Sequence, residues 1–473
     1  MTPARTATLT LLALAACPGD VATSTTASTD TTGPAPATST TTDPTPTSDA
    51  PDSGDTSAAG TTDTTTSDTT TTSDTTTSDT TAADTTTGAL PTCTPEGSPF
   101  IKWSAQGEQL PGHVAAAAAT PLGDSVVVGR TYAEGPKYDA FVAVHGPDGA
   151  PRWTDTYAGV HGLGDAAIDV AVDAEGFVHV LVIEVVSEVW VEQGPITDRR
   201  LVVLRYAPDG AHVWRWERAF VPMQLPGDHD PSGALEIVGD TIHLLEGNGN
   251  TPRRRVELDR FGNQIGDTLI QLPDEVEQYK ISVQTVGPDG AVYLGAEYYS
   301  GQGDPQPWLG SFALDGSLAW SATFGVYKDR AETLIVGDDG GVVVLWRRKV
   351  GFEPWMTRHE PGGAVAWTWQ FPFGPGLATG GLSCDGTTLL AGFADEPAGP
   401  ELEWDQRRDL GIWGLNSDGV PRWGQQHEFG PPYSYGGATV VAGAPDGDAL
   451  VAGSYLGDDG STYRAWLGRY SFE

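Results

Sequence analysis

The stretch "DAFVAVHGPDGAPRWTDTYAGVHGLGDAAIDVAVDAEGFVHVLV", from Asp139 to Val182, decides the fold of this chain. Apolar side chains alternate with others before a turn at Asp148-Gly149, and again before a turn at Glu175-Gly176. Another strand-like segment follows each turn, the first of them ending at Trp153. Alternation on both sides of such a turn is typical of a β-hairpin. The stretch therefore predicts two consecutive hairpins, which together make one four-stranded unit.

Two markers show that this unit recurs along the chain. The first is a turn glycine four residues before a tryptophan, at Gly149/Trp153, Gly210/Trp214, Gly316/Trp320, Gly363/Trp367 and Gly419/Trp423. A weaker copy, Gly262 to Gly266, has lost its tryptophan, and Trp103 heads the series without a preceding strand. The second marker is the inner-turn glycine, at Gly123, Gly176, Gly239, Gly290, Gly340, Gly386 and Gly447. Both markers count seven in the same phase, which indicates a true repeat.

A four-stranded sheet cannot bury both faces alone, so such units stack on neighbours around an axis. The sequence thus predicts an all-β fold, a seven-bladed β-propeller with four-stranded blades, over residues 93–473. The closing segment "RAWLGRYSFE", from Arg464 to Glu473, matches the strand before an outer turn, but no partner strand follows it. Pro99 to Trp103 is an orphan strand at the other end. We expect these terminal strands to pair and close the seventh blade, which leaves no open edge.

The repeat also resembles a known family. "DAFVAVHGPDGAPRW" followed by "DVAVDAEGFVHV", with "WLGSFALDGSLAW" and "TLIVGDDGGVVVL" as further copies, resembles the bacterial SBBP-type β-propeller repeats, and less closely the PQQ-type repeats of quinoproteins. The resemblance covers residues 98–473 and implies a propeller. It implies no particular activity, because these repeats occur in envelope proteins of mostly unassigned activity. The third copy, Asp228 to Leu272, departs most from the pattern.

The N-terminus has the features of an export signal, predicted over residues 1–16. Arg5 precedes an apolar run, Ala7 to Ala16, which is too short to span a bilayer. Leu14-Ala15-Ala16-Cys17 resembles the lipobox of bacterial lipoproteins, which implies cleavage before Cys17 and acylation of its thiol and amino group. The alternative is an ordinary signal peptide. Two or three acyl chains suffice for stable anchoring, so we expect a lipid-anchored protein of the bacterial cell envelope, at the outer membrane or cell surface.

Residues 17–92 are predicted to be a disordered tether. Thr, Ser, Asp, Ala and Pro dominate, with 11 Asp and no Lys or Arg, so the segment cannot bury enough apolar surface to fold. Its Thr and Ser content also permits O-glycosylation. The whole chain carries a net charge of −37, which argues against nucleic-acid partners and against electrostatic docking on anionic lipid. The expected state is a monomer.

Two cysteines remain after Cys17, namely Cys93 and Cys384. Disulfides are permitted in an exported chain; Cys384 falls at the inner turn of the predicted blade 6, and Cys93 precedes the outer strand of blade 7 on the same face. The sequence allows either a Cys93–Cys384 disulfide or two unrelated thiols.

Long connections are expected on the edge opposite the hairpin turns, at Glu184–Arg200, Phe220–Ser232, Ala296–Trp308 and Phe393–Leu410. Variable loops on a rigid scaffold often carry binding. The candidate binding-face aromatics are Trp190, Tyr298, Tyr299, Trp404, Tyr433 and Tyr435. Exposed aromatics would suit sugar or protein contact, and the alternative is that each folds back over a blade end.

Catalytic signals are weak. The sequence contains no HExxH, GxSxG or P-loop pattern. Asp228, His229 and Asp230 adjoin on one loop, but three consecutive residues rarely converge on one ion, so we expect neither metal nor cofactor. The basic runs Arg253–Arg255 and Arg347–Lys349 are expected to be solvated.

The predicted function is a non-catalytic, tethered propeller that binds an envelope protein or a glycan through its loop face. The alternative is a propeller-type enzyme, glycan-cleaving or quinoprotein-like, with its site at the central channel. Carboxylates or arginines converging there from several blades would favour the enzyme.

Overall fold

The computed structural model describes residues 99–106, 110, 112–131, 138–191, 194–219, 232–247, 253–273, 280–298, 306–325, 329–347, 354–370, 376–382, 386–395, 408–427, 436–456 and 463–472. Within these ranges every regular element is a β-strand, numbered β1 to β28. No helix there is long and apolar enough to cross a membrane.

The strands form seven four-stranded antiparallel sheets. Blades 1 and 2 contain β2 (Gly112–Ala119), β3 (Ser125–Thr131), β4 (Ala140–His145), β5 (Pro151–Tyr157), β6 (Asp165–Val172), β7 (Val178–Val191), β8 (Gly194–Tyr206) and β9 (His212–Ala219). Blades 3 and 4 contain β10 (Ser232–Val238), β11 (Thr241–Gly247), β12 (Arg254–Asp259), β13 (Gln264–Leu269), β14 (Lys280–Val286), β15 (Val292–Tyr298), β16 (Gln306–Phe312) and β17 (Leu318–Thr323). Blades 5 and 6 contain β18 (Arg330–Val336), β19 (Val342–Arg347), β20 (Pro354–His359), β21 (Val365–Gln370), β22 (Gly376–Leu382), β23 (Thr388–Asp395), β24 (Arg408–Leu415) and β25 (Pro421–His427). Blade 7 contains β26 (Gly436–Gly443), β27 (Ala449–Leu456), β28 (Tyr463–Phe472) and β1 (Pro99–Gln106).

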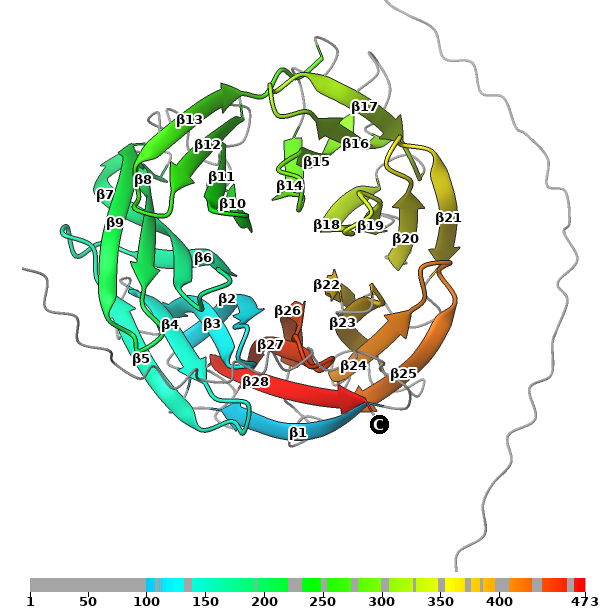
Figure 1. Cartoon of the computed structure of the whole chain (residues 1–473), viewed down its shortest axis with the longest axis horizontal. Helices are drawn as coiled ribbons and strands as arrows, with labels where there is room; N and C mark the ends of the chain where they lie inside the picture. The colour runs from blue at the N-terminus through cyan, green and yellow to red at the C-terminus, as the bar shows by residue number, and fades with distance from the viewer. Residues whose placement is uncertain are drawn as a thin grey trace, which may run out of the picture. The chain divides into compact units, whose positions relative to one another are not determined.

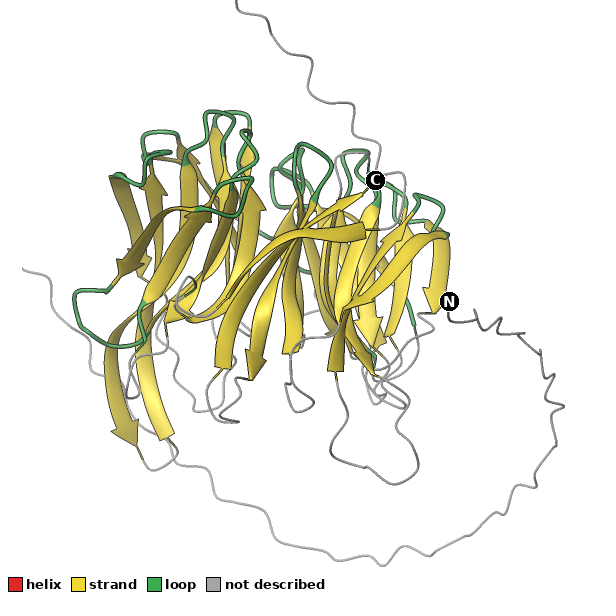
Figure 2. Ribbon diagram, turned by 90° about the horizontal axis from the view of Figure 1, so that it is seen from below, coloured by secondary structure: helices red, strands yellow, loops and turns green. Residues whose placement is uncertain are grey.

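The seven sheets stand around a common axis, so the molecule is a seven-bladed β-propeller, as the repeat predicts. In each blade the first strand lies nearest the centre and the fourth lies at the rim (Figure 1). Most of the described turns lie along one edge of the ring (Figure 2).

Burial follows this arrangement, because neighbouring blades cover both faces of each sheet. The second and third strands are almost wholly buried, as in β3 and β4, whereas rim strands such as β5 and β21 alternate exposed with half-buried residues. The described apolar residues form seven core clusters, one at each junction between blades. Each blade is thus stabilised mainly by its two neighbours.

The glycines of both markers occupy the tight turns that the sequence predicts. All thirteen have positive φ: Gly123, Gly149, Gly176, Gly210, Gly239, Gly262, Gly290, Gly316, Gly340, Gly363, Gly386, Gly419 and Gly447. Only glycine adopts this conformation without steric cost. Both predicted hairpins are therefore confirmed in blades 1 to 6, and the inner hairpin is confirmed in blade 7.

The marker tryptophans join consecutive blades. Trp153 Nε1 donates to the carbonyl oxygen of Pro208, in the outer turn of the next blade, at 3.0 Å, and its ring lies against Gly210 of that turn. Trp103, Trp214 and Trp367 make the same bond to the next outer turn at 2.8 to 3.0 Å. The repeated glycine and tryptophan are therefore the two halves of one contact between blades.

Blade 3 keeps this connection without its tryptophan. Gly266 occupies the tryptophan position in β13, and the following backbone takes over the contact with the next turn. The amide nitrogen of Gln271 donates to the carbonyl oxygen of Gly316 at 2.8 Å. The degenerate third copy is a complete four-stranded blade, with β10 to β13 paired in order.

The ring closes where the two ends of the described chain meet. β1 pairs with β28 over its whole length, with Trp103 opposite Arg469 and Gln106 opposite Trp466. Arg469 is fully buried, and its guanidinium donates to Asp448 at 2.6 Å and to the carbonyl oxygen of Gly123 in blade 1. The predicted closure by terminal strands is confirmed.

One predicted loop is wrong. Glu184–Arg200 was expected to be a connection, but β7 and β8 continue through it and pair as far as Val191 opposite Gly194. The fully buried Glu184 accepts hydrogen bonds from Arg200 Nη2 at 2.7 Å and from Arg215 Nη2 at 2.9 Å. These charge-assisted bonds stabilise the base of the longer hairpin.

A predicted solvated run is also wrong. Arg253 and Arg255 are only 0 % and 2 % exposed. Arg255 donates to the carbonyl oxygens of Gly290, at 2.9 Å, and Leu314 in the next blade, which compensates for the loss of water. Arg347 fits the expectation better, with a side chain 40 % exposed and an ion pair to Glu332.

Candidate functional site

One position in each blade sets the shape of the junction to the next blade on the hairpin-turn side. It is the third-strand residue that pairs with the rim-strand tryptophan, or with Gly266 in blade 3. We call it the junction position, and its residues in blades 1 to 7 are Val144, Arg205, Glu257, Ser311, Arg358, Gly414 and Arg469.

In three blades the junction position is a buried arginine that pairs with the inner turn of its own blade. Arg205 Nη2 lies 2.9 Å from Asp173 Oδ2, Arg358 pairs with Asp339, and Arg469 Nη2 lies 2.5 Å from Asp446 Oδ2. Arg205 also donates to the carbonyl oxygen of Arg260 in the next blade at 2.6 Å. A guanidinium with several donors in one plane suits such bridging.

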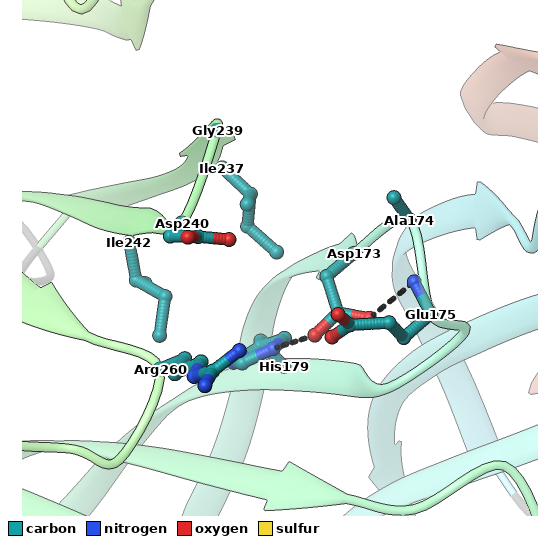
Figure 3. Close-up of a pocket in the computed structure, with 9 residues that line it drawn as sticks. All are labelled: Asp173, Ala174, Glu175, His179, Ile237, Gly239, Asp240, Ile242 and Arg260. Atoms are coloured by element: carbon teal, nitrogen blue, oxygen red, sulfur yellow. Dashed lines mark hydrogen bonds and ion pairs between the residues drawn. The ribbon is translucent and has the colours of Figure 1, made fainter.

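Arg205 leaves little room at the junction of blades 2 and 3. Its guanidinium carbon lies 3.8 Å above the centre of the Phe177 ring. The cleft that remains, the blade 2–3 cleft, has a volume of about 40 Å³. Figure 3 shows its lining: Asp173, Ala174, Glu175, His179, Ile237, Gly239, Asp240, Ile242 and Arg260.

Two ionisable groups of the blade 2–3 cleft, Asp173 and His179, pair with each other. His179 Nε2 lies 3.2 Å from Asp173 Oδ2. Burial opposes ionisation of Asp173, but hydrogen bonds from His179, the Phe177 amide and Arg205 outweigh it and lower the pKa of Asp173. Burial lowers the pKa of His179. The pairing of these groups is structural.

The junction of blades 4 and 5 is much more open. It holds a cleft of about 510 Å³, the blade 4–5 cleft. Blade 4 contributes Pro288, Asp289, Ala291, Tyr293, Ser311, Phe312, Ala313, Ala319 and Trp320, and blade 5 contributes Asp338, Asp339, Gly340 and Pro361. The lining contains apolar and aromatic side chains together with three aspartates.

Two small residues stand at this junction where larger ones stand at the junction of blades 2 and 3. Ser311 occupies the junction position where Arg205 stands in blade 2, and Ala291 precedes β15 where Phe177 precedes β7. The other junctions without an arginine are occupied: Val144 is buried in a core cluster, Arg255 pairs with Glu257 at 2.8 Å, and the Trp423 ring packs against Gly414.

Tyr293 and Trp320 form the aromatic wall of the blade 4–5 cleft. Their ring centres are 6.4 Å apart, and Trp320 also stacks on His359 at 6.0 Å. Burial raises the pKa of Tyr293, the charge of Asp289 raises it further, and a hydrogen bond with Ser311 partly offsets both. The tyrosine is therefore neutral at physiological pH.

A separate pair of carboxylates lies on the innermost strands of blades 2 and 3. Burial raises the pKa of Asp169 on β6 to about 6, against opposing hydrogen bonds from the Leu235 and Val170 amides. Burial, with a smaller effect of the Asp169 charge, raises the pKa of Glu236 on β10 to about 7. The Leu235 amide donates to Asp169 at 2.7 Å, so Asp169 also links the two blades.

The predicted site residues are only partly within the described chain. Tyr298 ends β15 and is half-buried against the core between blades 3 and 4. Trp190 lies on β7, but its side chain is outside the described part. The residues that lie wholly outside it are Cys17, Cys93, Cys384, Tyr299, Trp404, Tyr433, Tyr435 and Asp228 to Asp230. The described residues contain no group of three side chains placed to hold a metal.

Sequence reasoning missed the blade 4–5 cleft, although a signal was present. Aligning the repeats on their tryptophans places Ser311 of "GSFALDGSLAW" beneath Arg205 of "LRYAPDGAHVW". A small residue where other copies carry a long one predicts a gap at that junction.

Comparison with known proteins adds the following. No protein-family profile and no curated protein matches the sequence. Among solved structures, the chain is similar to a protein of unknown function from Dyadobacter fermentans, with a TM-score of 0.43 and 13 % identity over 79 % of this chain and 99 % of that one. It is similar to the WD40 domain of Neurospora crassa Pan2, with a TM-score of 0.41 and 11 % identity over 80 % of this chain and 97 % of that one. It is also similar to a Synechocystis apocarotenoid oxygenase mutant, with a TM-score of 0.37 and 12 % identity over 55 % of this chain and 62 % of that one.

Proposed function

We propose that this protein is a lipid-anchored β-propeller of the bacterial cell envelope that binds a protein or a glycan without catalysing a reaction. The blade 4–5 cleft carries the proposal. It combines an aromatic wall, Tyr293 and Trp320, with aspartates in about 510 Å³, which is the size and mixed lining of a typical recognition pocket. It lies on the hairpin-turn side, and binding by the opposite, long-loop face stays a prediction.

Site-specific photo-crosslinking tests this binding role. A photoreactive amino acid in place of Ala313, which lines the cleft, should capture a discrete partner on intact cells. The matched control is Ala207, the equivalent residue of the outer turn in blade 2, which is half-buried to a similar degree. Equal capture from both positions, or none from Ala313, would contradict binding at this cleft.

The lipid anchor is tested separately, through Cys17 within the proposed 1–16 signal peptide and 17–92 tether. Cys17→Ser removes the thiol that accepts the diacylglyceryl group, so the variant should move from the detergent-dependent membrane fraction to the soluble fraction. Membrane association unchanged by this substitution would exclude acylation as the anchor.

One observation favours an enzyme as the second candidate. Asp169 and Glu236 lie on adjacent innermost strands with raised pKa values, which is the property of carboxyl groups that act as general acids in glycan cleavage. In that case the full chain would hydrolyse envelope glycan, and Glu236→Gln would abolish turnover. Turnover that survives Glu236→Gln would remove these carboxylates from consideration.

A further inference from the structure

We propose that the blade 4–5 cleft binds an arginine side chain from a segment of a partner protein. This inference rests on the proposed binding function and specifies its ligand. The fold itself supplies the precedent, because blades 2, 5 and 7 fill the same junction with their own arginines, Arg205, Arg358 and Arg469. In blade 4 the residue is Ser311, and the space is open.

The groups that receive those internal arginines recur around the open cleft. Arg358 and Arg469 pair with the aspartate just before the inner-turn glycine, and in blade 4 that residue is Asp289. Among the described residues, no cation pairs with Asp289. Arg205 donates to the carbonyl of Arg260, two residues before the next outer-turn glycine, and the equivalent residue in blade 5 is Pro361. Carboxylate and turn residue thus line the cleft together.

The hydrogen bonding of Trp320 gives an independent indication that a ligand can bind at this junction. The indole N–H groups of Trp103, Trp153, Trp214 and Trp367 donate to the next outer turn. For Trp320 the equivalent acceptor is Pro361, but within the described chain no such bond forms, and both residues line the cleft. The turn carbonyl is therefore not taken by the tryptophan.

The chemistry of the cleft selects a guanidinium. A planar cation can stack on Trp320 or Tyr293 while its edge donates to carboxylates, just as Arg205 lies over Phe177 while it pairs with Asp173. Asp338 adds negative charge on the blade 5 side, whereas Asp339 is already paired with Arg358, and the chain as a whole carries −37. A lysine ammonium has the charge but neither the plane nor the number of donors.

Peptide binding to the full chain tests the proposal. The probe is acetyl-Gly-Arg-Gly-amide, measured by isothermal titration, with the citrulline peptide as a neutral isostere and the lysine peptide as a second cation. The arginine peptide should bind at least about tenfold more tightly than the citrulline peptide, because hydrogen bonds to charged groups are lost in the latter. The lysine peptide should fall between them.

Two variants locate the site. Ser311→Arg places an internal arginine in blade 4, so peptide binding should disappear while the melting temperature stays equal or rises. Asp289→Asn should weaken binding about tenfold. The control is Glu175→Gln, which changes the equivalent turn carboxylate at the filled junction of blades 2 and 3 and should leave affinity unchanged.

The outcomes separate this inference from the broader function. Equal affinity for the arginine and citrulline peptides, or arginine binding that survives both Ser311→Arg and Asp289→Asn, overturns arginine recognition at this cleft. If neither peptide binds but the crosslinker at Ala313 still captures a partner, arginine recognition fails and the binding function stands. If neither assay detects a ligand, both fail.

Discussion

At the scale of single residues, one contact recurs around the ring: a rim-strand tryptophan against a turn glycine of the next blade. At Gly210, φ is +88°, and an added Cβ would lie 2.8 Å from the Trp153 ring. Glycine is needed there for two reasons, its backbone conformation and the close approach of the indole. The tryptophan in turn provides both apolar area and a hydrogen bond to that turn.

Gly210→Ala should therefore destabilise the protein by more than the cost of a positive φ at an alanine, because the added Cβ also meets the Trp153 ring. Gly176→Ala is the matched control, because its φ is +85° but its nearest neighbour, Pro208, is at an ordinary 3.6 Å. We expect a loss of about 1 to 2 kcal/mol for Gly176→Ala, and about 1 to 3 kcal/mol more for Gly210→Ala through overpacking. Urea unfolding measures the free energy of unfolding of both variants. Equal losses would show that the Trp153 indole moves aside at no cost.

The raised pKa of Glu236 also belongs to this scale. Because the folded state holds this proton more tightly than the unfolded state, the contribution of Glu236 to the free energy of unfolding is full below about pH 4.5 and declines up to about pH 7. Glu236→Gln should therefore gain stability relative to the natural protein as the pH rises from 5 to 8. Urea midpoints at both pH values test this, with exposed Glu175→Gln as control. A pH-independent difference would mean that the carboxyl is normally solvated.

At the scale of elements, blade 3 shows that the contact between blades can be made by backbone. Without a tryptophan at Gly266, the chain after β13 approaches the next outer turn, and the Gln271 amide bonds to Gly316. An unpaired carbonyl would otherwise be left at that junction.

Removing this amide donor should loosen blade 3 from blade 4. Gln271→Pro has no N–H and should lower the free energy of unfolding by about 1 to 3 kcal/mol. Gln271→Ala keeps the amide and changes only an exposed side chain, so it should be close to neutral. Hydrogen exchange of the β13 amides offers a local readout, and similar exchange in both variants would contradict a role for the bond.

The hairpins were predictable because their signals are local, such as Gly149 next to alternating apolar residues. The longer hairpin of β7 and β8 was not, because Glu184 and Arg200 are charged residues typical of a loop, and only the folded blade shows that they pair with each other at the base of the hairpin. The blade 4–5 cleft was missed because Ser311 looks ordinary within its own copy, and only alignment with Arg205 in another copy shows that a long side chain is absent. Binding through the face that bears the long loops remains a prediction.

At the scale of the whole molecule, stability depends on one closure. β28 pairs with β27 on one side and β1 on the other, and it places Trp466, Arg469 and Tyr470 in the interior at 1 % exposure or less. Nothing else among the described strands completes blade 7.

Deleting residues 465–473 should therefore abolish cooperative unfolding rather than merely lower the melting temperature. β1 would lose its partner strand and β27 one of its two, and the faces of blades 1 and 6 would be exposed to water. Calorimetry of the truncated and natural proteins is the measurement. A truncated protein that melts in a single transition at the natural temperature would show that closure is dispensable.

The pairing of β1 with β28 also determines the order in which parts of the propeller can fold during synthesis. Gln106 pairs with Trp466, so β1 emerges 360 residues before its partner exists. At about 5 to 20 residues per second, that interval lasts roughly 20 to 70 s. During this interval β1 has no partner strand in the nascent chain, and blade 7 cannot be completed. Synthesis of β28 thus decides when blade 7 can close.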